Sequence, residues 1–219
     1  MNLVSQAVPS RTALKSSLKQ GLTALEIRLD SGAIGHLIDY LTLLEKWNRV
    51  YNLTAVRDPA KMVSHHLLDS LAILPQIEGT ARLLDVGSGA GFPGMPLAIA
   101  RPDCSVTLLD SSHKKAAFLR QAVGELGLGN VAVVCERVET WRAEPNFDLI
   151  VSRALADLGE FAGQSSHLLA AGGRFAAMKG LYPFEEIERL PKGIAVRSVV
   201  KLEVPGLRAE RHLVIMAAL

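Results

Sequence analysis

The sequence of 219 residues has little cysteine, few aromatic residues and almost no excess of charge. Cys104 and Cys135 are too few for a disulfide framework, and no Cys-x-x-Cys pair is present to bind zinc. We expect both to be buried, reduced thiols. Aromatic residues make up 5%, and the formal net charge is +2. Such a balance neither requires nor excludes a nucleic-acid partner, because a basic face can be local.

Long apolar runs are also missing. No stretch has the length needed to span a bilayer, and residues 1–20 lack the apolar centre of a secretory signal. These absences predict a cytoplasmic protein with no membrane partner. What is present is a large apolar fraction, 49%, beside 21% charged residues. That composition is typical of a globular protein with a sizeable core.

The first third of the chain has the periodicity of helices. Residues 1–19 are weakly patterned and are predicted to form a tail. Apolar residues recur every three or four positions over 34–50, which predicts one amphipathic helix. Asp58 and Pro59 are typical of a helix start, because Asp caps free N–H groups and proline has none to satisfy. Residues 1–78 are therefore interpreted as a helical segment that packs on the remainder.

Short apolar runs then alternate with helical stretches, as in RLLDV, SVTLLD, VAVVCE, FDLIV and RFAAMKG. Such runs are typical of strands covered on both faces, and hence of a parallel sheet with right-handed crossovers. The last two runs, RSVVKLEV and RHLVIMAAL, are too close for a helix between them, so one terminal strand is predicted to be antiparallel. The predicted fold of residues 79–219 is α/β, a doubly wound, mostly parallel seven-stranded sheet.

A glycine-rich stretch, GSGAGFPG, directly follows the first predicted strand. Ligands of doubly wound sheets bind at the carboxyl ends of the strands. Glycine lets the backbone turn sharply and approach a ligand closely. We expect the helix that follows, beginning near Phe92 or Pro93, to offer free N–H groups that suit a phosphate or a carboxylate.

This stretch fits two templates. Gly89, Gly91 and Gly94 match G-x-G-x-x-G, the dinucleotide pattern, although Pro93 stands where that pattern needs a close helix–strand contact. The run D-x-G-x-G-x-G that begins at Asp85 resembles instead the first motif of S-adenosylmethionine-dependent methyltransferases. A carboxylate there suits the cationic amino group of the sulfonium donor and would repel a pyrophosphate. The charge of Asp85 therefore favours the methyltransferase template.

Two further acids follow predicted strands. Asp110 ends the second strand, where a carboxylate can accept both hydroxyls of a ribose. Its alternative role is to cap the next helix. Glu139 follows the third strand, at a position near the adenine in such enzymes, and its alternative is a solvated acid on a loop.

Several segments together resemble one family, the bacterial ribosomal RNA small-subunit methyltransferase G proteins, also called glucose-inhibited division protein B. They are VSHHLLDSL, LLDVGSGAGFPGMPLAI, LLDSSHKKAAFL, ERVE and FDLIVSRAL, in this order and spacing. The resemblance implies the class I S-adenosylmethionine-dependent fold, and methylation of N7 of guanine 527 in 16S rRNA. It also implies cofactor contacts by Gly87 and Phe92, by Val138 and Glu139 beside the adenine, and by Arg153. The segment SSHKKAAFL departs from the family pattern after Asp110.

The chemistry of this reaction requires few groups. Guanine N7 has a lone pair and no proton, so its methylation needs no general base. We therefore predict no catalytic acid or base, and a mechanism that depends on positioning. Arg153 is interpreted as a contact to the cofactor, to RNA phosphates or to O6 of the guanine. The alternative for Arg153 is an ion pair with Asp148 or Asp157.

Substrate contacts are predicted at His66, Lys179 and Arg208, and base stacking at Phe92, Trp141 or Tyr182. Adjacent histidines point to different sides of a helix, so no metal site is predicted, and one histidine is expected to pair with Asp69. The predicted partner is 16S rRNA or the small ribosomal subunit, bound by a monomer. An NAD-dependent oxidoreductase and a non-catalytic RNA-binding protein remain as alternatives.

Overall fold

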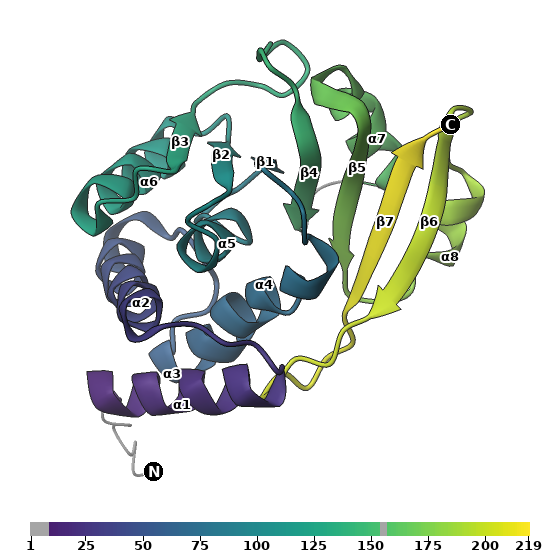
Figure 1. The fold of residues 1–219 in the computed structure, drawn as a ribbon. Coiled ribbons are helices and arrows are strands. Elements are labelled where there is room, and N and C mark those ends of the chain that lie inside the picture. The colour runs from purple at the N-terminus through teal and green to yellow at the C-terminus, as the bar shows by residue number, and fades with distance from the viewer. Residues whose placement is uncertain (1–8, 154–156) are drawn as a thin grey trace, which may run out of the picture.

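The computed structural model describes residues 9–153 and 157–219, which form a seven-stranded sheet between two layers of helices (Figure 1). The strand order is β3-β2-β1-β4-β5-β7-β6. The strands are β1 (Arg82–Val86), β2 (Ser105–Leu109), β3 (Val131–Val134), β4 (Phe147–Arg153), β5 (Leu169–Lys179), β6 (Ile194–Lys201) and β7 (His212–Ala218). Neighbouring strands from β3 to β5 are parallel, while β7 is antiparallel to both β5 and β6. The predicted fold class and the antiparallel strand are thus confirmed.

Two apolar clusters cover the two faces of the sheet, because successive residues of a strand point to opposite sides. Leu83 contributes to the cluster under α2, α5 and α6, whereas Leu84 contributes to the cluster under α7. The helices of the sequence are α1 (Arg11–Ala24), α2 (Ser31–Tyr51), α3 (Pro59–Met62), α4 (Asp69–Leu71), α5 (Gly94–Ala100), α6 (His113–Leu126), α7 (Leu158–Ser165) and α8 (Phe184–Glu188), with 3-10 turns η2 (Leu74–Gln76) and η3 (Ser166–Leu168).

The N-terminal helices correct one prediction and confirm two. Residues 11–19 belong to α1 and not to a tail, because Leu14, Leu18 and Leu22 bury one face of this helix. Residues 1–8 lie outside the described residues. The amphipathic helix is α2, and the Asp58 carboxylate accepts from the N–H of Ala60 (2.9 Å), as its capping role predicts.

The segment after α3 is a single π-helical stretch, η1 (Val63–Leu68), which continues into α4. Figure 1 shows α1, α3 and α4 along the lower edge of the molecule, the edge toward which β4, β5 and β6 run. These helices therefore lie at the carboxyl ends of the parallel strands, where a ligand of such a sheet is expected.

Both cysteines are free thiols. Cys104 is buried, and burial raises the pKa of its thiol. Cys135 is only half-buried, with its Sγ 3.4 Å from Nδ1 of His113, so the expectation of two buried thiols holds for Cys104 alone. None of the described helices combines the length and apolar character needed to cross a membrane.

Candidate cofactor site

A cavity of about 330 Å³ opens at the carboxyl ends of β1, β2 and β4. Five of the nine predicted cofactor residues line it: Gly87, Asp110, Val138, Glu139 and Arg153. Sequence reasoning missed Ser111, Lys115, Glu136, Arg137 and Gln164 as lining residues. Proximity to strand ends could have indicated the first four, because each lies within a few residues of Asp110 or Val138. Gln164 lies in α7, away from the carboxyl end of any strand, and carries no signal in the sequence.

The glycine turn after β1 is held by the end of β2. Gly87, Gly89 and Gly91 have φ of +68°, +59° and +81°, in the left-handed region that favours glycine. The N–H groups of Gly87 and Ser88 both donate to the carbonyl of Leu109, at 2.9 and 3.0 Å. The N–H of Gly89 donates to Oδ2 of Asp110 (2.8 Å). This turn is therefore fixed by the neighbouring strand before any ligand binds.

Two of the glycines serve packing within the protein. A methyl group on Gly91 would overlap Oη of Tyr40 and lie 2.8 Å from Leu119. A methyl group on Gly94 would overlap Leu108 and lie 2.7 Å from Oδ2 of Asp85. The close helix–strand contact of the dinucleotide pattern is thus made by Gly94, and Pro93 does not prevent it.

The start of α5 differs from the prediction of free N–H groups. The N–H of Gly94 donates to Oδ2 of Asp85 (2.8 Å), and that of Met95 donates to the carbonyl of Gly91 (2.8 Å). Pro93 and Pro96 have no N–H to offer. A pyrophosphate would find these donors already used, which disfavours the dinucleotide template.

Asp85 is fully buried beneath the turn, and only one of its oxygens is satisfied. Oδ2 accepts from Gly94, whereas Oδ1 has no hydrogen-bond partner among the described residues. Burial raises the pKa of this carboxyl group from 3.8 to about 7, although the Gly94 N–H and the charge of Arg153 oppose the rise. A buried, half-satisfied carboxylate is costly unless a cation or a donor meets it. Asp85 does not itself line the cavity, but its chain neighbours Val86 and Gly87 do.

Ser112 is the N-cap residue of α6, so Asp110 does not cap this helix as its alternative role predicted. Oδ1 of Asp110 accepts from the N–H of Ser112 (2.9 Å) at the start of α6, and its Oδ2 accepts from Gly89 and lies 3.4 Å from Nζ of Lys115. The carboxylate also faces the cavity. Each of its oxygens has two lone pairs, so these bonds leave acceptor capacity for a ribose.

Arg153 has a different partner from either one predicted. Its Nη1 donates to Oδ2 of Asp69 (2.9 Å) and to the carbonyl of His65 (3.0 Å). The second oxygen of Asp69 accepts from Nε of Arg211 (2.9 Å). Asp148 instead binds the N–H groups at the start of β1, and Asp157 caps α7. Asp69, 1% exposed, therefore holds two arginines from distant parts of the chain.

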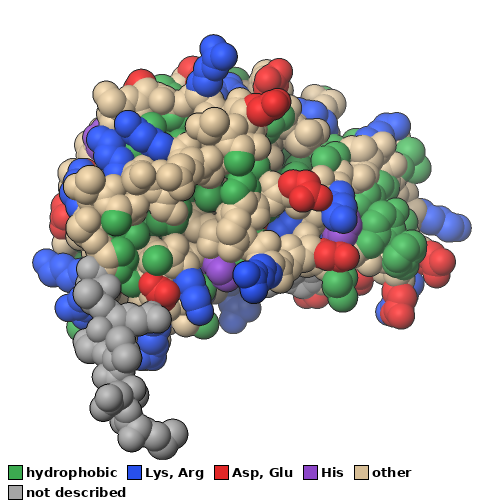
Figure 2. Space-filling model, turned by 90° about the horizontal axis from the view of Figure 1, so that it is seen from below, with side chains coloured by type: hydrophobic (Ala, Val, Ile, Leu, Met, Phe, Trp, Pro, Cys, Tyr) green, Lys and Arg blue, Asp and Glu red, His purple; other side chains and the backbone are tan. Residues whose placement is uncertain are grey.

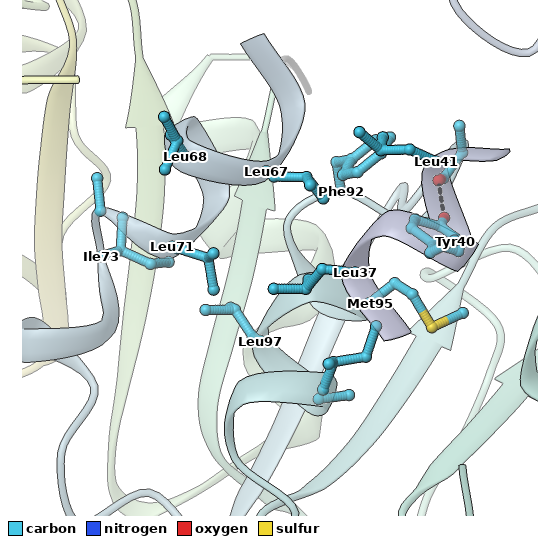
Figure 3. Packing of buried hydrophobic residues seen from close by; sticks show 14 of the residues in the cluster. Leu37, Tyr40, Leu41, Leu67, Leu68, Leu71, Ile73, Phe92, Met95 and Leu97 are labelled. Carbon is cyan, nitrogen blue, oxygen red and sulfur yellow. Dashed lines mark hydrogen bonds between the residues drawn. The ribbon is translucent and has the colours of Figure 1, made fainter. Parts of the chain in front are cut away.

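Phe92 and His66 form a buried stack beside this arginine. Phe92 is 3% exposed, its ring centroid lies 4.4 Å from that of His66, and the Arg153 guanidinium lies over the Phe92 ring, 5.1 Å from its centroid. Figure 3 shows Phe92 among Tyr40, Leu67 and Leu41. Burial, with Arg153 nearby, lowers the pKa of His66 to about 4. Nε2 of His66 lies 2.9 Å from Oγ1 of Thr54, so the predicted pairing of a histidine with Asp69 is wrong.

The remaining predicted residues lie elsewhere. Nζ of Lys179 pairs with Glu186 (2.7 Å), and Arg208 lines a different groove, described below. Trp141 packs on the second apolar cluster, and Tyr182 is 39% exposed. Ala154 and Leu155, part of the segment FDLIVSRAL, lie outside the described residues. In residues 9–153 and 157–219, no three His, Cys, Asp or Glu side chains group as metal ligands would.

Tyr40 is a residue near the site that sequence reasoning did not single out. It lies in α2, is fully buried, and donates from Oη to the carbonyl of Ala90 within the glycine turn. Burial raises the pKa of its phenol well above 10, so the hydroxyl stays a donor. The helical segment thus helps to set the shape of the turn.

Solved structures with this fold include the glycopeptide N-methyltransferase MtfA. Its complex with S-adenosyl-L-homocysteine has a TM-score of 0.60 at 13% identity, covering 70% of this chain and 88% of that one. Its complex with S-adenosyl-L-methionine has a TM-score of 0.57 at 14% identity, covering 69% and 87%. The strand order and these neighbours define the fold of the class I S-adenosylmethionine-dependent methyltransferases.

The family model described as rRNA small subunit methyltransferase G matches residues 33–214, and the chain belongs to this family. A relative from Laribacter hongkongensis (strain HLHK9), named Ribosomal RNA small subunit methyltransferase G, is 58% identical over 201 residues. The match covers 92% of this chain and 97% of the relative. A relative of the same name from Chromobacterium violaceum is 56% identical over 201 residues, covering 92% and 96%.

Proposed function

We propose that this protein methylates N7 of one guanine in small-subunit rRNA, guanine 527 of 16S rRNA by its family, with S-adenosylmethionine as the donor. The observation that carries the proposal is the buried Asp85 carboxylate, whose Oδ1 has no partner among the described residues. An anion at this point, with no free N–H at the start of α5, fits a cationic ligand and not a pyrophosphate.

The residues present fit this cofactor. Asp85 would attract its amino group, directly or through water, and Asp110 would accept the ribose hydroxyls. Val138 and Glu139 would flank the adenine, and Gly87 would let the backbone approach the ligand. Gly89, Gly91 and Phe92 would stabilise the conformation of the glycine turn on its protein side. When bound, S-adenosylmethionine supplies an activated methyl group.

The chain's contribution to the chemistry is placement. N7 uses its lone pair and has no proton to lose, so the site needs no base. His66, with a pKa of about 4, is neutral and buried, and the guanidinium of Arg153 cannot be deprotonated at neutral pH. Arg153, held by Asp69 at the cavity wall, would contact O6 of the guanine or a neighbouring phosphate. Correct placement alone can supply a large part of the rate.

The direct test uses purified protein, labelled S-adenosylmethionine and small ribosomal subunits that lack the modification. We expect label in 16S rRNA, and chain cleavage after borohydride and aniline treatment at one guanine, which identifies N7-methylguanine. Calorimetry should show binding of S-adenosylmethionine and S-adenosylhomocysteine but not of NAD. Binding of NAD would favour the oxidoreductase, and cofactor binding without transfer would favour a non-catalytic RNA-binding protein.

Cofactor affinity should depend on pH through Asp85. With a pKa of about 7, the ionised fraction of this carboxyl group rises ~tenfold from pH 6 to pH 8. A cationic amino group binds the ionised form, so the affinity for S-adenosylmethionine should rise by about the same factor. The pKa of Asp85 in the folded protein lies above its unfolded value of 3.8. The ligand-free protein therefore loses stability as the pH rises from about 3.8 to about 7.

Calorimetry at pH 6, 7 and 8 measures this dependence, with Asp85→Asn as the matched variant. We expect Asp85→Asn to bind more weakly at pH 8 and to lose most of the pH dependence. His66, with a pKa of about 4, does not titrate in this range and is not the source. An equal pH dependence in Asp85→Asn would show that Asp85 does not meet the amino group.

A further inference from the structure

A second hollow, a groove of about 760 Å³, lies between α1, the π-helix η1 and the loop 202–211 that joins β6 to β7. Ser17 and Gln20 come from α1, Lys61 and His65 from the helices beside it, and Arg208 from the loop. Figure 2 looks onto this lower edge of the molecule and shows basic side chains and a histidine beside one another there. The groove is more than twice the volume of the cofactor cavity.

The charge of this groove is of one sign. Lys61 and Arg208 line it, and no Asp or Glu is among its described lining residues. In the part of the chain that the structure describes, neither side chain has a hydrogen bond or an ion pair of its own. Arg208 also lines a neighbouring hollow of about 330 Å³, together with Glu203 and Glu210 of the same loop. Two cations without an ion-pair partner, in a groove that no described Asp or Glu lines, suit an anionic chain.

The groove and the cofactor cavity share a wall. His65 lines the groove, and its carbonyl accepts from Nη1 of Arg153, which lines the cavity. Asp69 holds Arg153 with one oxygen and Arg211, the last residue of the loop, with the other. A nucleotide that enters the cavity would therefore have its chain neighbours beside this groove.

The walls of the groove are packed before any partner binds. A methyl group on Gly21 of α1 would overlap the side chain of Leu68 of η1, so these two helices cross closely. On the loop side, a methyl group on Gly206 would lie 3.4 Å from Cβ of Ser64. A preformed groove costs little reorganisation when a ligand enters it.

We propose that this groove holds the phosphate backbone of the RNA substrate, with Lys61 and Arg208 as phosphate contacts. The inference rests on the proposed function, since it identifies where the RNA of that reaction lies. Phosphate contacts by Lys and Arg supply much of the affinity of proteins for nucleic acids and make it depend on salt.

A competing surface is less suited to phosphates. Leu181, Tyr182 and Phe184 are 75%, 39% and 69% exposed, and the two rings lie 4.2 Å apart. Glu185, Glu186 and Glu188 follow directly in α8, and Glu186 already engages Lys179. Figure 2 shows apolar side chains with red neighbours on the side of β6 and α8. Like charge at this surface would repel an RNA backbone.

The test compares the double variant Lys61→Ala/Arg208→Ala with the wild type. Binding of a 16S rRNA transcript is measured by fluorescence anisotropy between 50 and 200 mM KCl, and methyl transfer to small subunits is measured in parallel. Each lost phosphate contact reduces the magnitude of the negative slope of log affinity against log salt by ~0.7–0.9. We expect this magnitude to decrease by about 1.5 in the double variant, and KM for RNA to rise. The affinity for S-adenosylmethionine and kcat at saturating RNA should be unchanged.

The matched control is Lys192→Ala/Arg197→Ala, which removes the same charge near the start of β6, whereas the loop 202–211 of the groove follows the end of this strand. This variant should keep the wild-type slope, and thermal melting should show that both double variants fold. Equal salt-dependence slopes in the two double variants would overturn the proposal that the groove binds RNA. A loss of RNA affinity confined to Tyr182→Ala would overturn it as well. If the wild type itself neither binds nor methylates the RNA, the proposed function fails instead.

Discussion

Replacing Gly91 with alanine is expected to destabilise the protein by about 2–5 kcal/mol. A left-handed φ of +81° costs an alanine ~1–2 kcal/mol. Its methyl group would also overlap Oη of Tyr40 and crowd Leu119, and overpacking adds ~1–3 kcal/mol. For a chain of this size the melting temperature should fall by roughly 4–20 °C, as measured by calorimetry or circular dichroism.

Gly89→Ala is the matched control, because Gly89 shares the left-handed backbone but not the crowding. Its φ is +59°, and the nearest atom to an added methyl group is the Gly87 carbonyl oxygen at 3.8 Å. We expect a loss of only about 1–2 kcal/mol. A second variant, Gly91→Ala with Tyr40→Phe, removes the overlapped hydroxyl and should recover part of the loss. Equal destabilisation by Gly89→Ala and Gly91→Ala would contradict the packing role of Gly91.

Asp69→Asn is expected to lower methyl transfer by about 10²-fold and to destabilise the fold. Removing one partner of a buried ion pair costs ~3–5 kcal/mol, but the side chains of Arg153 and Arg211 are 21% and 24% exposed, so water offsets part of it. We expect the free energy of unfolding, measured by urea denaturation, to fall by about 2–3 kcal/mol. The activity falls because Arg153 is no longer fixed over Phe92 at the cavity wall, and small misplacements can cost ~10²-fold.

Asp69 is a positioning residue, and two comparisons separate this role from a merely structural one. Asp39→Asn removes an exposed partner of Arg11 and should cost under ~1 kcal/mol with no change in activity. Arg153→Lys keeps the charge but not the planar fork, and should lose activity with a smaller loss of stability. If Asp69→Asn lost stability yet kept wild-type kcat and KM at a temperature where it is folded, Asp69 would not position Arg153 for the reaction.

The sequence alone determined the alternation of strands and helices, and with it the fold. Apolar runs such as RLLDV and FDLIV must be covered on both faces, and this leaves few arrangements other than a doubly wound parallel sheet. The sequence also located the glycine turn, because glycine is favoured where φ is left-handed, and it located the capped helix start at Asp58. These are local properties, fixed by neighbours in the chain.

Tertiary structure alone decided how the site is held together. Arg153 meets Asp69, which is 84 residues away, and not the nearby Asp148 or Asp157. Gly91 is required by Tyr40 of α2, and the donors at the start of α5 are used by Asp85 and Gly91. Residues 11–19, which look unpatterned, form a helix because η1 offers an apolar surface to Leu14 and Leu18. Contacts between distant segments depend on packing in three dimensions, and spacing along one chain does not record them.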